Sequence, residues 1–406
     1  MHLPLSNRRA EYRMLEHPPM KALRTAGETR GREDHERGGR QDRQEETGET
    51  ARHAEHAGRD HEPAQRWRCV FAHLRRRIPR SHAAHRSDLR GLRQRLALGW
   101  LLAVGAAAPV MPQALSVAAL ELTEHPLAGR IWDTRSGAEI EPQEVYRRAA
   151  AHRFVLLGET HDNPVHHELQ ARVLERIAAT GRQPLVAWEM IDASHATALA
   201  DCLARCEDWV SELPQRLEWA TSGWPDWSLY VPIAAVAARY ALPMAAANLS
   251  DDELRRILDG ADVAESGEPA ELSPPLPEPA RAHLEQTLTD SHCGMPIPDA
   301  RLAAMIRVQR ARDRRMSAVL EHGSADDGSV LIAGSGHTRL DWGAGFDLSH
   351  AYDAANVLAL AFLEVSSDCA SAGECIEARA GKEPPWDVVW FTPRAVREDP
   401  CARLRS

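Results

Sequence analysis

Two segments of the chain share the pattern Gly-x-x-His, from Gly158 to His161 and from Gly334 to His337. Each follows a short apolar run that is typical of a buried strand. In an open parallel sheet, ligands bind beyond the carboxyl ends of the strands, so we expect both imidazoles at one edge of a sheet. An imidazole can bind a metal or move a proton near neutral pH. The pair therefore indicates a binding or acid–base site.

Two carboxylates are expected beside these histidines. Glu159 lies inside the first motif, and Glu189 directly follows the apolar run 184–188. Together with His161 and His337, they could bind a metal or cofactor through nitrogen and oxygen atoms, or carry out acid–base chemistry. The alternative is a buried polar network that only stabilises the fold.

A helix is predicted from Pro164 to about Ala179. His166 falls inside the apolar stripe of this helix and is expected to point toward the sheet, whereas His167 lies at the border of the stripe. Two roles remain open for His166. It either belongs to the site or forms a structural hydrogen bond to a carbonyl group at the end of a strand.

A longer helix, predicted from about Asp299 to Glu321, carries polar residues on its apolar face. Gln309 and Asp313 share that face with leucine, isoleucine and methionine side chains. Burying an amide without a hydrogen bond costs roughly 2–7 kcal/mol. We therefore expect a partner for both residues, either Arg312 or a histidine of the site.

The loop before this helix contains an imidazole, a thiol and a thioether, on His292, Cys293 and Met295. All three groups can bind haem iron or a soft metal. A turn with a buried thiol is the simpler interpretation, and the spacing favours it. His292 is therefore a weaker candidate for the site than His161 and His337.

Other cysteines are close enough along the chain to form disulfides if the protein is exported. The two pairs are Cys202 with Cys206 and Cys369 with Cys375. Neither pair has the spacing of a zinc site. The sequence contains no Cys-x-x-Cys-His segment, which excludes the covalent attachment of a c-type haem.

From about residue 120, short apolar runs alternate with longer helical patterns, which is typical of an α/β domain. We expect a mostly parallel sheet flanked by helices, in one main domain over residues 120–406. The predicted strands are 153–157, 184–188, 243–247, 330–333, 356–365 and 387–391. The further predicted helices are 196–205 and 251–259, and residues 261–279 are expected to form a loop.

The N-terminal part differs in composition from the rest. Residues 1–95 are rich in Arg, His, Glu and Gly, so they are predicted to be disordered or to precede the true start of translation. Residues 96–118 resemble a secretory signal peptide, with an apolar run and the small-x-small site Ser116-Val117-Ala118. We expect an exported protein, periplasmic or associated with the membrane. No lipidation cysteine follows the segment.

Size and charge set broad limits on the function. The chain has 406 residues, is 43% hydrophobic and carries a formal net charge of −10. It can therefore bury a core for one large domain or two ordinary ones. The negative charge gives no electrostatic reason to expect nucleic acid as a partner.

The chain resembles the ChaN-like haem-binding proteins of the wider Tiki/TraB superfamily in several segments. These are LLGETHDNPVHHELQ, VAWEM, DSHCGMP with the later VQRARDRRM, and GSGH. The resemblance covers roughly residues 150–345, and GETHDNPVHH is its most distinctive part.

This resemblance implies an envelope protein that binds haem without catalysis and takes part in haem or iron uptake, with haem as its cofactor. It also implies a homodimer with paired haems and a tyrosine as the iron ligand. Tyr230 is the preferred candidate because tryptophans near it could supply an apolar wall, and Tyr146 and Tyr240 are alternatives. The residues expected around haem are His161, His337, Glu159, Glu189, His166, His292 and Tyr230.

The same superfamily includes metal-dependent peptidases with paired Gly-x-x-His motifs, which gives an alternative function. A Mn, Co or Zn ion would then be bound by His161, His337 and Glu159. Glu159 and Glu189 are then the catalytic candidates, and one of them would act as the base that deprotonates a metal-bound water. A haem carrier needs instead an apolar slot lined by Trp, Met and Leu. A third alternative is an envelope interaction protein whose polar cluster only stabilises the fold.

Overall fold

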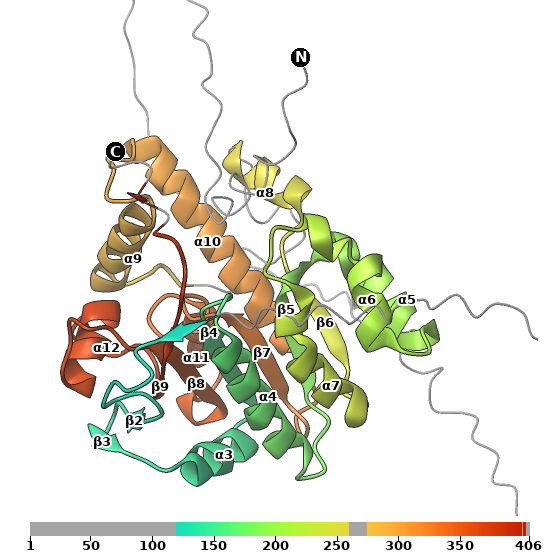
Figure 1. Cartoon of the computed structure of the whole chain (residues 1–406). Helices are drawn as coiled ribbons and strands as arrows, with labels where there is room; N and C mark the ends of the chain where they lie inside the picture. Colours follow the sequence, from blue (N-terminus) through green and yellow to red (C-terminus); the bar gives the residue numbers. More distant parts are fainter. Residues whose placement is uncertain (1–118, 260–273, 400, 403–406) are drawn as a thin grey trace, which may run out of the picture. The chain divides into compact units, whose positions relative to one another are not determined.

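The structure is a computed structural model that describes residues 119–259, 274–399 and 401–402. The predicted segments 1–95 and 96–118 lie outside the described residues, as does most of the predicted loop 261–279. In the described part, strands alternate with helices along the chain, as expected for an α/β domain (Figure 1). No helix among these residues is both long and apolar enough to cross a membrane.

The described strands form an eight-stranded sheet in the order β3-β2-β9-β8-β4-β7-β5-β6, and β1 pairs with β10 separately. The six strands from β9 to β6 are parallel, whereas β2 pairs antiparallel with both β9 and β3. The predicted mostly parallel sheet is therefore confirmed. The strands are β1 Leu120–Glu121, β2 Ile131–Asp133, β3 Ala138–Glu139, β4 Phe154–Glu159, β5 Leu185–Asp192, β6 Met244–Asn248, β7 Ser329–Gly334, β8 Val357–Glu364, β9 Val388–Thr392 and β10 Arg394–Ala395.

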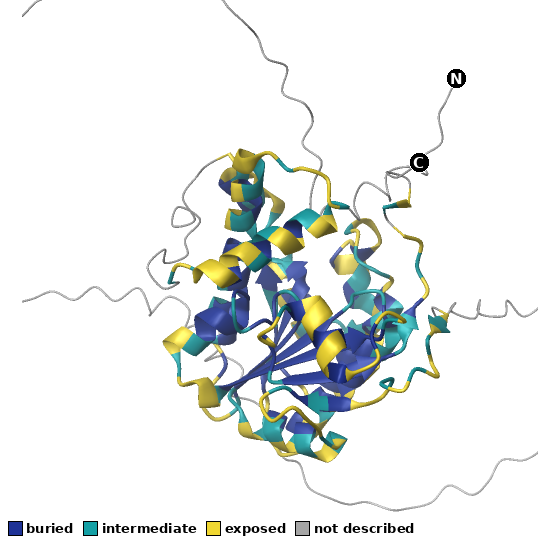
Figure 2. Cartoon of the chain, turned by 90° about the vertical axis from the view of Figure 1, so that its left-hand side faces the viewer, coloured by how far each residue is buried: buried dark blue, intermediate teal, exposed yellow. Residues whose placement is uncertain are grey.

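Helices cover both faces of the sheet, and Figure 2 shows the strands as a buried layer between helices whose outer surfaces are exposed. In β4, Val155 and Leu157 pack toward α3, α4 and α7, while Phe154 and Leu156 pack toward α10, α11 and α12. This alternation follows from the two-residue period of a strand. The helices are α3 Pro142–Ala151, α4 Pro164–Ala178, α5 Ala196–Arg205, α6 Trp209–Arg216, α7 Val231–Arg239, α8 Asp251–Leu258, α9 Glu278–Ser291, α10 Asp299–Leu320, α11 Ala344–Ala351 and α12 Ala372–Ala380.

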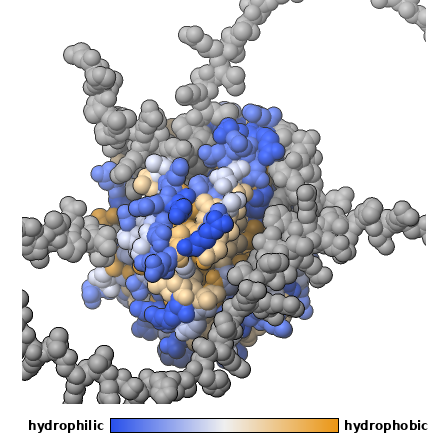
Figure 3. All heavy atoms as spheres, turned by 90° about the vertical axis from the view of Figure 1, so that its right-hand side faces the viewer, coloured by the Kyte–Doolittle hydropathy of each residue, from blue (hydrophilic) through white to orange (hydrophobic). Residues whose placement is uncertain are grey.

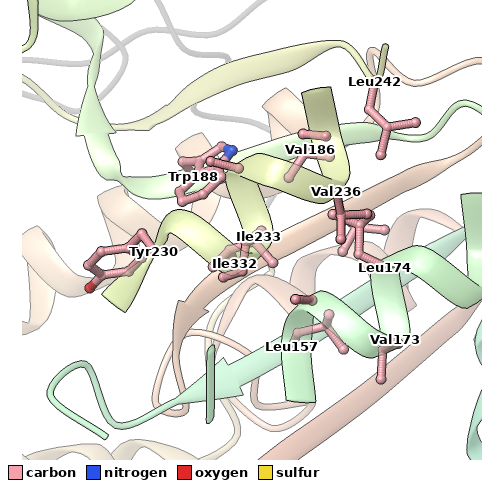
Figure 4. Close-up of a cluster of buried hydrophobic side chains, with 14 of the residues drawn as sticks. Leu157, Val173, Leu174, Val186, Trp188, Tyr230, Ile233, Val236, Leu242 and Ile332 are labelled. Carbon is pink, nitrogen blue, oxygen red and sulfur yellow. The ribbon is translucent and has the colours of Figure 1, made fainter. Parts of the chain in front are cut away.

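The first helix layer is held by large side chains near the site. Trp188 of β5 and Tyr230, at the start of α7, are the two largest fully buried side chains of the described part. Figure 4 shows them in one cluster with Ile233 and Leu157. Burying such a side chain contributes about 1.5–3 kcal/mol. Tyr230 is thus a core residue in addition to being a candidate for the site.

On the outside, the face that carries α5 and α6 combines hydrophobic patches with strongly hydrophilic ones (Figure 3). The two shorter predicted helices, 196–205 and 251–259, are present, whereas α6 was not predicted. α5 spans the predicted residues, and α8 begins after Ser250, which forms a reciprocal capping box with Glu253. Such a box satisfies two backbone groups that the first helical turn leaves open.

Strand β5 is longer than predicted and runs to Asp192. The prediction ended this strand at Trp188 because a glutamate follows, but Glu189 is buried inside the strand. Its charge is accommodated because a backbone amide and a histidine lie against its oxygens. The pairing of β5 with β6 shifts register between Trp188 and Asp192, beside this carboxylate.

Three disulfides occur in the described part of the chain. Two of them join the predicted pairs, Cys202 with Cys206 and Cys369 with Cys375. The third joins Cys293 to Cys401. The interpretation of Cys293 as a buried thiol is therefore wrong. Its partner lies 108 residues away in sequence, and spacing alone does not reveal such a bond.

Candidate functional site

Three neighbouring strands bring the predicted polar residues together. β7 lies between β4 and β5 in the sheet, and Glu159 at the end of β4 is in register with Gly334 at the end of β7. Glu189 extends from β5 on the other side of β7. Because all three strands are parallel, both Gly-x-x-His motifs and Glu189 meet at one edge of the sheet, as expected.

The first glycine of each motif allows two chain segments to approach closely. A Cβ atom on Gly158 would collide with the Thr338 hydroxyl and lie 2.9 Å from the Cα of Ser335. A Cβ atom on Gly334 would lie 3.0 Å from Nε2 of His161. The two motifs therefore fit together only with glycine at both positions. Gly158 leaves room for Ser335 and Thr338, and Gly334 leaves room for His161.

Glu159 is the centre of one half of the site. Its Oε1 lies 2.8 Å from Nδ1 of His161 and accepts a hydrogen bond of 3.4 Å from the Tyr230 hydroxyl. Its Oε2 lies 3.1 Å from Nδ1 of His167. Burial opposes the charged carboxylate, but attraction to His167 and hydrogen bonds with both imidazoles hold the pKa of Glu159 below its ordinary value. Glu159 is therefore a buried carboxylate that fixes two histidine rings.

His337 is the centre of the other half. Its Nδ1 lies 2.6 Å from Oδ1 of Asp313, and its Nε2 lies 3.3 Å from Oε1 of Glu189. Burial alone would lower the pKa of His337, but the two carboxylates outweigh it and raise this pKa to about 10. His337 is thus held as a cation. The histidine partner expected for Asp313 is therefore confirmed, and Gln309 lies beside the same ring, with its Nε2 3.3 Å from Nδ1 of His337.

The two halves meet between His161 and Glu189. Nε2 of His161 lies 3.8 Å from Oε2 of Glu189, and that oxygen also accepts a hydrogen bond of 2.7 Å from the backbone of Gly334. Imidazoles and carboxylates therefore alternate without interruption from His167 to Asp313. Removing one member would affect the others, because such networks are cooperative.

A pocket of about 860 Å³ lies over this network. Its size is within the range of roughly 300–1,000 Å³ that is typical of small-molecule and cofactor sites. His161 and Glu189 form part of the wall, and the ring of Trp224 lies 4.9 Å from that of His161. The apolar residues of the wall are Met190, Ile191, Leu217, Trp219, Trp224, Leu249, Leu254, Leu258, Leu288, Met305 and Val308.

Other predicted site residues lie outside the wall of this pocket. Glu159 and His337 contact wall residues from the buried side, and Tyr230 is 0% exposed. His292 ends α9, where its Nδ1 lies 2.7 Å from the carbonyl oxygen of Leu288. The structure therefore brings His161, His337, Glu159, Glu189 and Tyr230 into one network, and it places His292 elsewhere.

His166 is fully buried below the first motif. Its Nδ1 accepts a hydrogen bond of 2.8 Å from the backbone of Thr160, and its Nε2 lies 2.8 Å from the Thr392 hydroxyl. Burial lowers the pKa of His166 to about 3, so the ring is neutral. These contacts connect the loop after β4 to β9, so His166 has structural hydrogen bonds, although its partners are a backbone N–H and a hydroxyl and not the expected carbonyl.

His167 belongs to the network, although sequence reasoning did not select it. It is buried, it contacts Glu159, and its ring lies 4.4 Å from that of Tyr230. The available signal was its position at the border of the apolar stripe of α4, next to His166. A border position allows a side chain to reach the end of a neighbouring strand.

In the described part of the chain, no group of three or more His, Cys, Asp or Glu residues is arranged to hold a metal ion. The contacts of the network explain this result. Both ring nitrogens of His337 face carboxylate oxygens, and Nδ1 of His161 faces Glu159. The side chains therefore pair with one another and do not converge on a common point.

Comparisons with known proteins agree with this architecture. The family model described as "Haem-binding uptake, Tiki superfamily, ChaN" matches residues 145–345. Among solved structures, that of cofacial haem binding to ChaN of Campylobacter jejuni is similar, with 20% identity and a TM-score of 0.50. The match covers 65% of this chain and 96% of that chain. At this identity the likeness concerns the fold.

Two further solved structures are less similar to this chain. An erythromycin esterase variant in its open conformation is 12% identical, with a TM-score of 0.38, and covers 63% of this chain and 94% of its own. A type III effector is 14% identical, with a TM-score of 0.32, and covers 61% and 91%. No curated protein matches the sequence. With its motifs, fold and family match together, the chain belongs to the ChaN family of haem-binding uptake proteins in the Tiki superfamily.

Proposed function

We propose that this chain binds haem in the pocket beside His161 and acts after export as a non-catalytic carrier in haem or iron uptake. The family to which it belongs is described as haem-binding uptake. One observation carries the proposal for this chain. The pocket of about 860 Å³ combines an imidazole with tryptophan, methionine and leucine side chains in a single wall.

The residues of the pocket fit the chemistry of haem. Haem has a large apolar ring that must be kept from water, and Trp219, Trp224 and Met305 provide apolar surface for it. Bound haem would supply an iron that accepts a nitrogen, oxygen or sulfur ligand. The pocket wall offers this kind of ligand on His161 and on the thioether of Met190.

His161 is the iron ligand that we propose. Its side chain is 18% exposed, and the hydrogen bond between its Nδ1 and Glu159 orients the ring. A second residue that fixes the ring in this way is common among metal-binding histidines. Tyr230 would have to leave a fully buried position and its hydrogen bond to Glu159 before it could reach the pocket. His337 is held as a cation and would have to lose its proton first.

Export and assembly are further parts of the proposal. The three disulfides of the described part support an oxidising compartment such as the periplasm, because disulfides are rare in reducing cytosol. The signal-like segment 96–118 predicted from the sequence agrees with this location. A homodimer and an association with the envelope remain predictions, which light scattering with and without haem and fractionation of cells would test.

The first experiment is a titration of the full chain with haem, followed by Soret absorbance. We expect saturable binding in the parent. His161→Ala should shift the Soret maximum and weaken binding at least about tenfold, because losing a ligand bond costs more than 1.4 kcal/mol. His195→Ala is the matched control, since His195 also lines the pocket but lies beside Asp192, 3.1 Å from its carboxylate.

Tyr230→Phe separates the two candidate ligands. An unchanged spectrum in this variant supports His161, whereas a spectral shift that occurs only in Tyr230→Phe would identify the tyrosine and imply that α7 moves. The carrier function would be wrong if the parent bound no haem while Mn, Co or Zn raised its melting temperature through His161 and His337. A metal-dependent hydrolase would then be the better hypothesis.

A further inference from the structure

On the basis of the proposed haem site, we infer that Arg312 binds a propionate carboxylate of the haem and thereby orients the ring in the pocket. Three arginines line the pocket. Arg255 forms an ion pair of 2.7 Å with Asp252, and Arg397 forms one of 2.7 Å with Asp162. Arg312 has no such partner among the described residues, and its buried Nε has no hydrogen-bond acceptor.

Two carboxylates, one on α10 and one on the adjacent helix α8, are engaged by other cations. Asp313, the next residue in α10, lies 2.6 Å from His337. Glu253 of α8 pairs with Arg315 at 2.7 Å. A buried donor without an acceptor is unfavourable, so Arg312 is a position at which an incoming anion would be stabilised.

The surroundings of Arg312 define the kind of anion. Met305, Val308, Gln309 and Arg312 line the pocket together and follow the three- and four-residue spacing of one helix face. The side chains before Arg312 are apolar, apart from Gln309, and Leu254 of α8 adds to this surface. The wall therefore suits an apolar body with an anionic end, and haem combines a ring of this kind with propionate carboxylates.

The position of Arg312 relative to the network is also suitable. Gln309 precedes it by three residues, which is roughly 4.5 Å along a helix, and contacts His337. Arg312 is thus displaced along α10 from the imidazoles of the sheet edge. A guanidinium binds a carboxylate through two parallel hydrogen bonds, which lysine cannot reproduce. Such a contact would fix the rotation of the ring in its plane, which an iron ligand alone leaves free.

The test compares haem with haem dimethyl ester, in which both carboxylates are neutral, under the same detergent conditions. We expect the parent to bind haem about tenfold more tightly than the ester, because a charge-assisted hydrogen bond is worth at least 1.4 kcal/mol. Arg312→Gln should remove this preference by weakening haem alone, and Arg312→Lys should restore part of it. Arg255→Gln is the control, and near-ultraviolet circular dichroism verifies that each variant is folded.

The outcomes separate this inference from the proposed function. If Arg312→Gln weakens haem and ester equally, or affects neither, Arg312 does not bind a carboxylate although the haem site stands. The long side chain of Arg312 would then only cover the apolar surface of the pocket wall. If the parent binds neither compound, the haem site itself is wrong and the inference fails with it.

Discussion

The two Gly-x-x-His motifs look equivalent in sequence but place their histidines in different environments. His161 has one carboxylate 2.8 Å from Nδ1 and a more distant one 3.8 Å from Nε2, a tryptophan ring lies beside it, and its side chain is 18% exposed. His337 has a carboxylate at each ring nitrogen, and its side chain is 8% exposed. The same motif therefore supplies a partly exposed histidine after β4 and a buried imidazolium after β7.

This difference indicates a division of roles within the site. A ring with one close orienting carboxylate can serve as a ligand where its side chain lines the pocket, as that of His161 does. A ring held between two carboxylates keeps its proton and balances their charge. His337 is thus a positioning residue that holds Glu189 in place, and Glu189 in turn lies 3.8 Å from Nε2 of His161.

The largest effect is expected when the contact between His337 and Asp313 is broken. Asp313→Asn removes the charge of one carboxylate and leaves a buried cation with a weaker partner. Removing one member of a buried ion pair costs about 3–5 kcal/mol, so the free energy of unfolding in urea should fall by that amount. His161→Ala should lower it by less, since the side chain of His161 is 18% exposed and Glu159 keeps its contacts with His167 and Tyr230.

Asp326→Asn is the control for the substitution, because Asp326 is exposed and follows the same helix. If Asp313→Asn were as stable as this control, the two halves of the site would not differ as proposed. His337 would then be as available for ligand binding as His161.

The sequence was sufficient to predict the elements that carry both motifs. The short apolar runs located β4, β5, β6 and β7 to within a few residues, because parallel strands buried on both faces are apolar throughout. The ends of β4 and β5 were less predictable. Glu159 and Glu189 extend these strands as buried charges, and only the three-dimensional contacts reveal what compensates for them.

Site residues that belong to a short sequence motif could be predicted, whereas those whose role depends on contacts between distant segments could not. His161 and His337 were identified from their motifs, and the polar face of α10 correctly required a partner for Asp313. His167 was missed because its role depends on the packing of α4 against the end of β4. The bond between Cys293 and Cys401 was missed for the same reason.

An intermediate effect is expected from the glycines of the second motif. Gly334→Ala places a Cβ atom 3.0 Å from Nε2 of His161 and 3.6 Å from Oε2 of Glu189, so the ring must move. Overpacking of this kind costs about 1–3 kcal/mol, and the Soret maximum of bound haem should shift because His161 is displaced. Gly336→Ala is a closely matched control, since its Cβ would have no atom within 4 Å.

Equal spectra and stabilities for Gly334→Ala and Gly336→Ala would show that the His161 ring can move away from position 334 without cost. The exposure of His161 to the pocket would then not depend on the close approach of β7. A shift in the spectrum without a loss of stability would instead locate the effect at the ring alone.

The effect that is smallest for each step of its measurement is the change of stability per pH unit, which tests whether His337 is a cation. Its pKa is about 10 in the folded protein and about 6.5 in an unfolded chain. The folded state therefore binds the proton more tightly, so this contribution is complete below pH 6.5 and is lost as pH rises toward 10. Between pH 7 and 9 the free energy of unfolding should decrease by about 1.2 kcal/mol per pH unit. His337→Gln should lower the overall stability but remove most of this slope, as measured by urea unfolding at each pH. An unchanged slope in that variant would mean that His337 is neutral and that the two motifs are electrostatically alike.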